Sequence, residues 1–346
     1  MKTSELDYEL PEELIAHTPI EPRDAARLLV LDRATQALAH RRFRDLGDAA
    51  RLRAGDVLVF NDTRVLAARL FATKLPTGGR VEVLLLKQLD PVTWEAVVGG
   101  SRVRVGTQLR IVPRDNGTAS DIRAAVTAAR DLGVRVLRFD RPIDLELDRL
   151  GHVPLPPYIH AQLSDPERYQ TIYARAPGSA AAPTAGLHFT PELMRSLRDR
   201  GVAQAFVELR VGLDTFRPID EEDVEQHHIH TEYCRVSAEA AQQIERSRQA
   251  GGRVIAVGTT TVRVLESAAS AGLPISAFEG DTSLFITPGF EFRMVDAMIT
   301  NFHLPRSTLL ALVFAFAGRE RVLQAYREAI AERYRFYSFG DSMLIL

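Results

Sequence analysis

Cysteine and lysine are both scarce in this chain of 346 residues. Cys234 is the single cysteine, which excludes an intrachain disulfide, a thiolate zinc knuckle and a three-cysteine iron–sulfur site. We therefore expect polar chemistry. Of the 43 basic residues only Lys2, Lys74 and Lys87 are lysines. Because alanine is also abundant, this skew indicates genome composition more than nucleic-acid binding, although the planar guanidinium group suits phosphate.

Long apolar runs and a strong charge of one sign are missing too. The longest apolar run, residues 309–317, is much shorter than a bilayer span, and the first ten residues are charged where a signal peptide would be apolar. We therefore expect a cytoplasmic protein with no membrane partner, and a monomer because no exposed apolar stripe is evident. The formal net charge of −2 does not itself predict nucleic acid as a partner, so any contact with RNA must be local.

The expected elements indicate two domains, and an apolar content of 46% is sufficient to fill both cores. Short β-type runs, punctuated by glycine and proline, follow one another at 81–86, 93–98, 102–105, 108–112, 122–127 and 134–139. Regularly spaced short strands with turn signals are typical of a small antiparallel barrel or sandwich. We interpret residues 65–150 as an inserted β-barrel domain.

The flanking residues, 1–64 and 151–346, are expected to form one discontinuous catalytic domain. After buried strands at 27–31 and 56–60, strands alternate with helices; the strands are 203–211, 232–236, 253–257, 283–286 and 297–300, and the helices are 191–200, 238–250, 260–271, 308–317 and 319–334. This alternation predicts βα units and a largely parallel sheet, open or closed into a barrel. The expected fold is α/β and multi-domain, a barrel-like βα domain with an inserted small antiparallel β-barrel domain.

Two distant segments are built alike around a histidine. His188 and His303 each lie between two large apolar residues, near hydroxyl groups and just before a strong helix start. Apolar neighbours desolvate an imidazole and a helix N-terminus disfavours its charged form, so both side chains are expected to be neutral near pH 7. Such groups suit proton transfer or substrate orientation. The alternative is a pair of core histidines satisfied by backbone carbonyl groups.

Two further segments could carry chemistry. Residues 253–263 join a strand to a turn at Gly258 and a helix start rich in hydroxyl groups, whose free N–H groups would hold a carboxylate or phosphate. The segment lacks a dinucleotide fingerprint or P-loop, and an ordinary βα turn is an equal alternative. Glu208 and Arg210 share one face of a strand, as a structural ion pair or as a base and the group that orients it.

Three histidines close together, His227, His228 and His230, invite interpretation as a metal site. No carboxylate or cysteine lies at a recognised ligand spacing from them, and exposed histidine clusters are common without metal. We therefore predict no metal site.

Six strings of residues resemble those of one family: LVFNDTRV at 58–65, GHVPLPPYI at 151–159, AAPTAGLHF at 181–189, VIAVGTTTVR at 254–263, TNFHLP at 300–305 and YRFYSFGD at 334–341. In this order they resemble the S-adenosylmethionine:tRNA ribosyltransferase-isomerase family of queuosine biosynthesis, over essentially the full length. Where that family usually has His-Val-Gly-x-Gly-Thr-Phe, this sequence has Arg210 for the histidine and Asp214 for the second glycine. These departures bear on any role of that histidine and on a tight turn at position 214.

The resemblance implies a transfer of the ribosyl part of S-adenosylmethionine to the aminomethyl group of 7-aminomethyl-7-deazaguanine at the tRNA wobble position. Adenine and methionine leave, and epoxyqueuosine remains. S-adenosylmethionine is thus an expected co-substrate, tRNA carrying 7-aminomethyl-7-deazaguanine is the expected partner, and no prosthetic group is expected. An α/β domain of barrel-like character with an inserted β-barrel is implied as well.

Matched to this chemistry, His188 and His303 are expected to handle protons or orient adenine and ribose, with Glu208 or Asp62 as further candidates for the base. The turn at 258–261 and Arg263 are expected to hold the methionine carboxylate. Other expected substrate-binding residues are Arg64, Tyr158, Pro183, Thr184, Ala185, Gly186, Leu187, Phe189, Val211, Gly212, Gly258, Thr259, Thr260, Thr261, Asn301 and Tyr337. Of these, Tyr158, Phe189 or Tyr337 would stack on a splayed base.

For tRNA we expect a basic track across the domain junction, formed by Arg41, Arg42, Arg44, Arg64, Arg102 and Arg104. The affinity for tRNA is then expected to fall steeply as the salt concentration rises. Two other functions are considered. A conventional methyltransferase would use the same donor but needs a glycine-rich loop after an early strand, which this chain lacks. A non-catalytic RNA-binding module would account for the β-barrel but not for the two histidines in the other domain.

Overall fold

The structure, a computed structural model, describes residues 1–49, 52–114, 120–130, 133–159, 163, 165–212, 218–229 and 231–346. The chain divides into two compact units. Unit 1 comprises Met1–Arg64, Pro156–Ala176 and Ala182–Leu346, and unit 2 comprises Val65–Leu155 and Pro177–Ala181. The sequence predicts an insert at 65–150, whereas unit 2 also takes in the residues up to Leu155 and the separate segment Pro177–Ala181.

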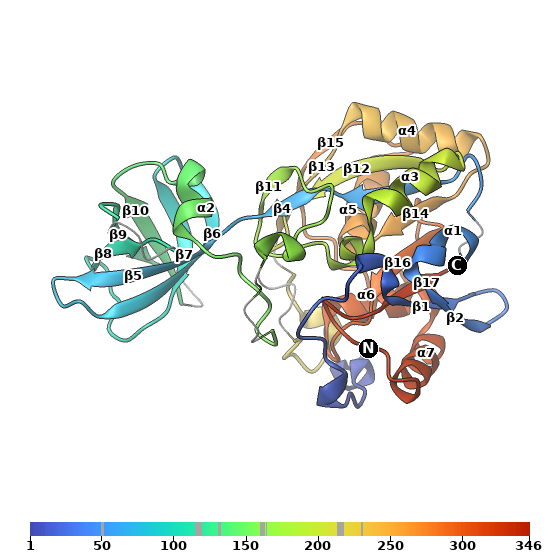
Figure 1. Cartoon of the computed structure of the whole chain (residues 1–346), viewed down its shortest axis with the longest axis horizontal. Coiled ribbons are helices and arrows are strands. Elements are labelled where there is room, and N and C mark those ends of the chain that lie inside the picture. Colours follow the sequence, from blue (N-terminus) through green and yellow to red (C-terminus); the bar gives the residue numbers. More distant parts are fainter. Residues whose placement is uncertain are drawn as a thin grey trace. The chain divides into compact units, whose positions relative to one another are not determined.

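Nine strands among the described residues of unit 1 form one mixed sheet, in the order β15–β13–β12–β3–β14–β16–β17–β1–β2 (Figure 1). Their bounds are β1 Arg27–Leu31, β2 Leu38–Arg42, β3 Val57–Asn61, β12 Ala203–Leu209, β13 Glu232–Val236, β14 Val254–Val257, β15 Phe278–Thr282, β16 Ala297–Asn301 and β17 Ser342–Ile345. The central strands β12, β3, β14 and β16 are parallel, while β13, β15, β17 and β2 introduce antiparallel pairs. The α/β class expected from the sequence is confirmed.

Three of the helices of unit 1 begin at capping hydroxyl groups that the sequence supplies. The helices of unit 1 are α1 Leu46–Ala49, α3 Pro191–Asp199, α4 Ala238–Gln249, α5 Thr259–Ala271, α6 Thr308–Ala317 and α7 Arg319–Ala331. The hydroxyl groups of Thr190, Ser237 and Ser307 accept hydrogen bonds from N–H groups in the first turns of α3, α4 and α6. Gly258, which precedes α5 with φ of 93°, provides no such side chain.

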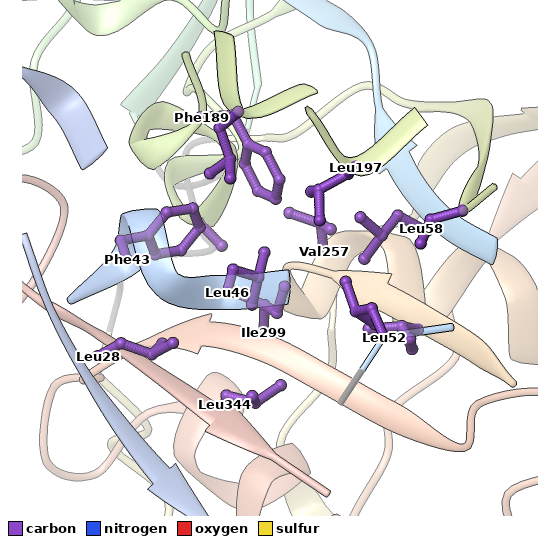
Figure 2. Packing of buried hydrophobic residues seen from close by; sticks show 14 of the residues in the cluster. Leu28, Phe43, Leu46, Leu52, Leu58, Phe189, Leu197, Val257, Ile299 and Leu344 are labelled. Carbon is purple, nitrogen blue, oxygen red and sulfur yellow. The ribbon is translucent and has the colours of Figure 1, made fainter. Parts of the chain in front are cut away.

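A buried apolar cluster supports the segment that carries His188. Figure 2 shows Phe189 and Leu197 above Leu58, Val257 and Ile299, which come from the central strands of the sheet. The ring of Phe189 is fully buried and packs edge-to-face against Phe43 and Phe60, with centroids 5.0 Å from each. Burying one such ring stabilises the fold by about 1.5–3 kcal/mol. Phe189 therefore anchors the histidine segment to the sheet, in the core instead of on a surface.

Unit 2 is built on a closed antiparallel barrel with the order β10–β7–β6–β5–β8–β9, as expected from the sequence. The bounds are β5 Arg69–Leu75, β6 Arg80–Asp90, β7 Thr93–Val98, β8 Gln108–Val112, β9 Arg123–Ala129 and β10 Val134–Phe139, and a short helix, α2 Leu147–Leu150, follows. Buried and exposed residues alternate along the strands, so one face fills the barrel. Two short strands, β4 Thr63–Val65 and β11 Ala176–Ser179, pair separately.

Two strand predictions are wrong. Residues 102–105 form turns instead of a strand: Arg102 has φ of 61°, and the N–H of Arg104 binds the hydroxyl of Thr107. Residues 283–286 lie beyond the end of β15, because the N–H of Leu284 binds the Thr282 hydroxyl and its carbonyl binds Arg263. In the described part of the chain, no helix combines the length and apolarity needed to cross a bilayer.

Candidate active site

His188 is buried at the end of a short 3-10 helix, Thr184–His188, which leads into α3. Its Nδ1 lies 3.2 Å from the carbonyl oxygen of Ala185 and its Nε2 lies 2.9 Å from that of Gly340. Burial lowers the pKa of the ring, and the two carbonyls partly oppose this. A neutral imidazole has one N–H, so only the protonated ring can donate to both carbonyls. Protonation of His188 thus gains a second hydrogen bond to a carbonyl but places a positive charge in a buried position.

His303 follows β16 and is held on both sides by phenols. The backbone N–H of His303 donates to the hydroxyl of Tyr326 at 2.9 Å, and its backbone carbonyl accepts from the hydroxyl of Tyr8. Its Nε2 lies 2.6 Å from the hydroxyl of Thr300. Burial lowers the pKa of His303 to about 3, so this ring is neutral at physiological pH, as the sequence predicts.

One buried amide joins three of the six strings. The hydroxyl of Thr184 donates to Oδ1 of Asn301 at 2.8 Å, and Nδ2 of Asn301 donates to the carbonyl of Tyr337 at 3.1 Å. The ring of Tyr337 lies 4.9 Å from that of Tyr158, whose hydroxyl is 2.6 Å from that of Ser338. The structure therefore brings the expected residues Thr184, Asn301, Tyr337 and Tyr158 together.

The backbone of Tyr337 is in an unusual conformation at this junction. Its φ is 70°, a left-handed value that costs a bulky residue about 1–3 kcal/mol. It persists because Tyr337 donates its N–H to Phe302 and its carbonyl accepts from Asn301 and Gly340. Such strain is typical of functional sites.

A small pocket lies beside His188. Its lining includes Leu187, His188, Ser338 and Gly340, together with Arg23 and Arg168, which the sequence analysis did not single out; His303 is not among the residues that line it. Arg23 donates to the carbonyls of Gln170, Leu187 and Glu167, and Arg168 to that of Ile20. Both arginines lie in short 3-10 helices, Arg23–Ala25 and Pro166–Tyr169, that carry no recognised motif, so only the folded chain shows that they line the pocket.

The two candidate carboxylates lie near each other at the ends of neighbouring strands. Asp62 accepts two hydrogen bonds from Arg175, at 2.7 and 3.1 Å, yet burial raises the pKa of Asp62 and the charge of Glu208 adds to that rise. Glu208 is 8% exposed and accepts from Nε of Arg210 at 2.8 Å. The guanidinium of Arg210 also lies 4.3 Å above the ring of Tyr233. Arg210 is thus tied to a carboxylate and an aromatic ring.

The start of α5 combines hydrogen-bonded hydroxyl groups with one guanidinium nitrogen that has no partner among the described residues. Thr261 donates to the Val257 carbonyl at 2.8 Å, and Thr260 accepts from Asn61 at 3.3 Å; Thr259 is buried beside them. Arg263 is 5% exposed; its Nε donates to the Leu284 carbonyl at 3.0 Å and its Nη1 pairs with Glu232. Within the described residues, the buried Nη2 of Arg263 has no partner.

Glu232 connects Arg263 to the stretch in which this chain departs from the pattern of the family that it resembles. Its Oε1 accepts the N–H of Gly212 at 2.7 Å, and its Oε2 accepts from Arg263. Val211 is buried next to Gly212. Asp214 lies outside the described residues. Sequence reasoning missed Glu232, because an acidic residue in a strand normally predicts a solvent-facing position.

The arginines expected to contact tRNA belong to both units. In unit 1, Arg64 pairs with Glu167 and Arg44 lies 3.9 Å from Asp24. Arg41 and Arg42 are exposed and donate to nearby backbone carbonyls. In unit 2, Arg102 and Arg104 are exposed in the turns between β7 and β8.

The histidine-rich segment is partly described. Nδ1 of His227 lies 2.8 Å from a carboxylate oxygen of Glu221, and His230 lies outside the described residues. Over the ranges that the structure describes, no three or more histidine, cysteine, aspartate or glutamate side chains are arranged to hold a metal ion.

Comparison with known proteins defines the class of enzyme. The model of a family described as queuosine biosynthesis protein matches residues 3–345. The S-adenosylmethionine:tRNA ribosyltransferase-isomerase of Symbiobacterium thermophilum is 54% identical over the whole of both chains, and that of Thermus thermophilus is 53% identical over 98% of each. A crystal structure of S-adenosylmethionine tRNA ribosyltransferase from Thermotoga maritima is 41% identical, covers 99% of this chain and all of its own, and superposes with a TM-score of 0.57.

The class is therefore a transferase of tRNA modification. This chain belongs to the queuosine biosynthesis protein family. The resemblance and the enzyme class expected from the sequence are confirmed.

Proposed function

We propose that this enzyme transfers the ribosyl part of S-adenosylmethionine to the aminomethyl group of 7-aminomethyl-7-deazaguanine at the wobble position of tRNA. The ribosyl group is isomerised, epoxyqueuosine remains in the tRNA, and adenine and methionine are released. The observation that supports the proposal is the match over essentially the full length with relatives named S-adenosylmethionine:tRNA ribosyltransferase-isomerase. In this proposal S-adenosylmethionine is a co-substrate, no prosthetic group takes part, and a monomer acts in the cytoplasm.

The reaction requires proton transfers at three places. The sulfonium acidifies the adjacent 5′ carbon, from which a base removes a proton; departing adenine must gain one; and the attacking amine must be neutral. A site that performs these steps needs groups that change protonation state and groups that stay neutral.

The environments of the two histidines support a division of this labour. We assign proton transfer to His188, because a second carbonyl is ready to bind its ring when a proton is added. We assign orientation of adenine or ribose to His303, because its low pKa keeps it neutral. Asp62, whose pKa burial raises, and Glu208 remain the candidates for the base at the 5′ carbon.

Arg263 is proposed to bind the methionine carboxylate together with the N–H groups of the turn at 258–261. Its unpartnered Nη2 is a buried donor, and an unsatisfied buried donor costs about 1–3 kcal/mol, more for a charged group. A carboxylate that accepts from it would remove that cost and form a charge-assisted hydrogen bond.

The test is a product analysis. The protein is incubated with S-adenosylmethionine labelled in the adenine and methyl groups, together with tRNA carrying 7-aminomethyl-7-deazaguanine. Free adenine and methionine are expected as products. In a parallel reaction with S-adenosylmethionine labelled in the ribosyl group, the label is expected in tRNA. S-adenosylhomocysteine as the product would instead indicate a methyltransferase, and binding of tRNA without binding of the donor would indicate a non-catalytic RNA-binding module.

A further inference from the structure

Three arginines form a row across four adjacent strands on the outside of the barrel in unit 2. Arg80 on β6 is paired with Thr73 on β5, Thr73 with Arg110 on β8, and Arg110 with Arg123 on β9. Paired residues in a sheet project from the same face. The three arginines are exposed and alternate with buried residues along their strands, so all three side chains lie on the outer surface.

This row is uncompensated by acidic groups. In the described part of the chain, the guanidinium groups of Arg80, Arg110 and Arg123 make no ion pair or hydrogen bond. The nearest carboxylate with a contact to the row, Asp140, accepts the backbone N–H of Arg123 at 3.2 Å and lies 3.5 Å from Nε of Arg141. Another arginine of the barrel, Arg69, is paired with Glu82 at 3.0 Å.

The charges of the row also oppose one another. Arg110 and Arg123 are direct cross-strand partners, and like charges in that position destabilise a sheet. Such a pair gains free energy when an anion binds between the two groups. The planar guanidinium binds a phosphate through two parallel hydrogen bonds, which makes phosphate the anion that arginine suits best.

A turn that carries Arg102 is tied to one end of β5. Nζ of Lys74, the residue after Thr73, donates to the carbonyl of Ser101 at 2.9 Å, which holds the turn carrying Arg102 close to that strand. Along the row itself, three strand spacings separate Arg80 from Arg123, or about 14 Å. A nucleic-acid strand rises about 3.4 Å per nucleotide, so the row is long enough to reach several phosphates of one strand.

We propose that the Arg80–Arg110–Arg123 row is a binding surface for the phosphate backbone of RNA. The inference rests on the proposed function, in which tRNA is the partner. The row adds affinity and positions the RNA on unit 2, and it carries no base specificity, because phosphate contacts do not read sequence.

The test measures binding of a full-length tRNA transcript to the full-length protein by fluorescence anisotropy, in a salt series from 50 to 200 mM. The variants are Arg110→Gln with Arg123→Gln, and Arg80→Gln. The control is Arg141→Gln in the same unit, which removes the same charge from a side chain paired with Asp121 and Asp140. Substitutions of exposed residues change stability by about 0.5 kcal/mol or less, so all variants are expected to fold.

Each arginine removed from the row is expected to lower the slope of log affinity against log salt by about 0.7–0.9. The loss of affinity between 50 and 200 mM salt then shrinks by roughly threefold per arginine. In turnover assays the row variants should raise KM for tRNA and leave kcat unchanged. An unchanged slope and affinity in the double variant would overturn the inference, as would an equal effect of Arg141→Gln, which would indicate net charge alone.

The two proposals fail in different ways. If the wild-type enzyme releases no adenine from the donor and substrate tRNA, the proposed function is wrong, whatever the row does in binding. If the wild type releases adenine while the double variant binds tRNA as tightly as the wild type, only the inference about the row is wrong.

Discussion

The buried pair of Glu232 and Arg263 permits a stringent test of how unit 1 is held together. The perturbation is Glu232→Gln, which preserves side-chain volume and an acceptor for the N–H of Gly212 but removes the negative charge. Both side chains of the pair are only 7% exposed, so the guanidinium cannot turn to water. Breaking a buried pair by neutralising one partner costs about 3–5 kcal/mol, because the other charge stays buried without compensation. The Nη2 of Arg263 already lacks a partner in the described structure, which places the expected loss towards the upper end.

The same sheet offers a matched control in Glu208→Gln. Glu208 is buried like Glu232, but its partner Arg210 has a side chain that is 45% exposed and can be solvated when the charge is lost. The expected cost of breaking that pair is below about 1 kcal/mol. The two substitutions are chemically identical and lie on neighbouring strands, so their difference isolates the burial of the arginine.

The assay is urea unfolding followed by two signals. Circular dichroism at 222 nm reports the helices, which lie mainly in unit 1, and the fluorescence of the single tryptophan, Trp94 on β7, reports unit 2. Glu232→Gln should shift the dichroism transition to lower urea and leave the Trp94 transition as the internal reference. Equal dichroism midpoints for the Glu232 and Glu208 variants would refute the reasoning, since burial of the partner would then be irrelevant.

Three further predictions concern the residues around the pocket and the junction. His188→Ala should abolish adenine release while thermal unfolding remains cooperative; near-normal release would contradict its role. Because the pKa of His303 is lowered to about 3, the unfolded state binds a proton that the folded state does not, so stability should fall by up to about 1.4 kcal/mol per unit as pH drops from about 6.5 towards 3. His303→Gln should flatten that dependence in urea titrations, and an unchanged slope would assign it to other groups. Asn301→Asp keeps the acceptor for Thr184 but loses the donor to Tyr337; we expect kcat to fall with little change in KM, and a wild-type kcat would exclude a role for this junction.

Local features of the chain could be predicted because short-range physics decides them. Strand and barrel signals in unit 2 come from alternation and from glycine at the turns, and helix starts come from capping hydroxyls such as those of Thr190 and Ser307. The lowered pKa of both histidines could be predicted from their apolar neighbours and from the helix starts that follow them. These predictions need no knowledge of which segments meet in space.

Long-range pairing could not be predicted in the same way. The C-terminal strand β17 lies between β16 and β1, and the three arginines of the barrel row face one another only through the register of four strands. The failed strand at 283–286 has the same origin. Its apolar residues suit a strand, but Arg263, twenty-one residues earlier, takes the carbonyl of Leu284 that a ladder would use.

That contact shows why the proposed carboxylate-binding role of Arg263 is difficult to separate from its role in the structure of unit 1. Its Nε holds the end of β15 through Leu284, its Nη1 holds β13 through Glu232, and Glu232 in turn holds Gly212 after β12. One guanidinium therefore ties three segments at the edge of the sheet and still has one donor to offer. A ligand that accepts a hydrogen bond from Nη2 would stabilise all three segments together. Binding of S-adenosylmethionine should therefore protect the backbone N–H of Gly212 from hydrogen exchange. Protection of Gly212 that is the same with and without S-adenosylmethionine would show that the carboxylate binds elsewhere.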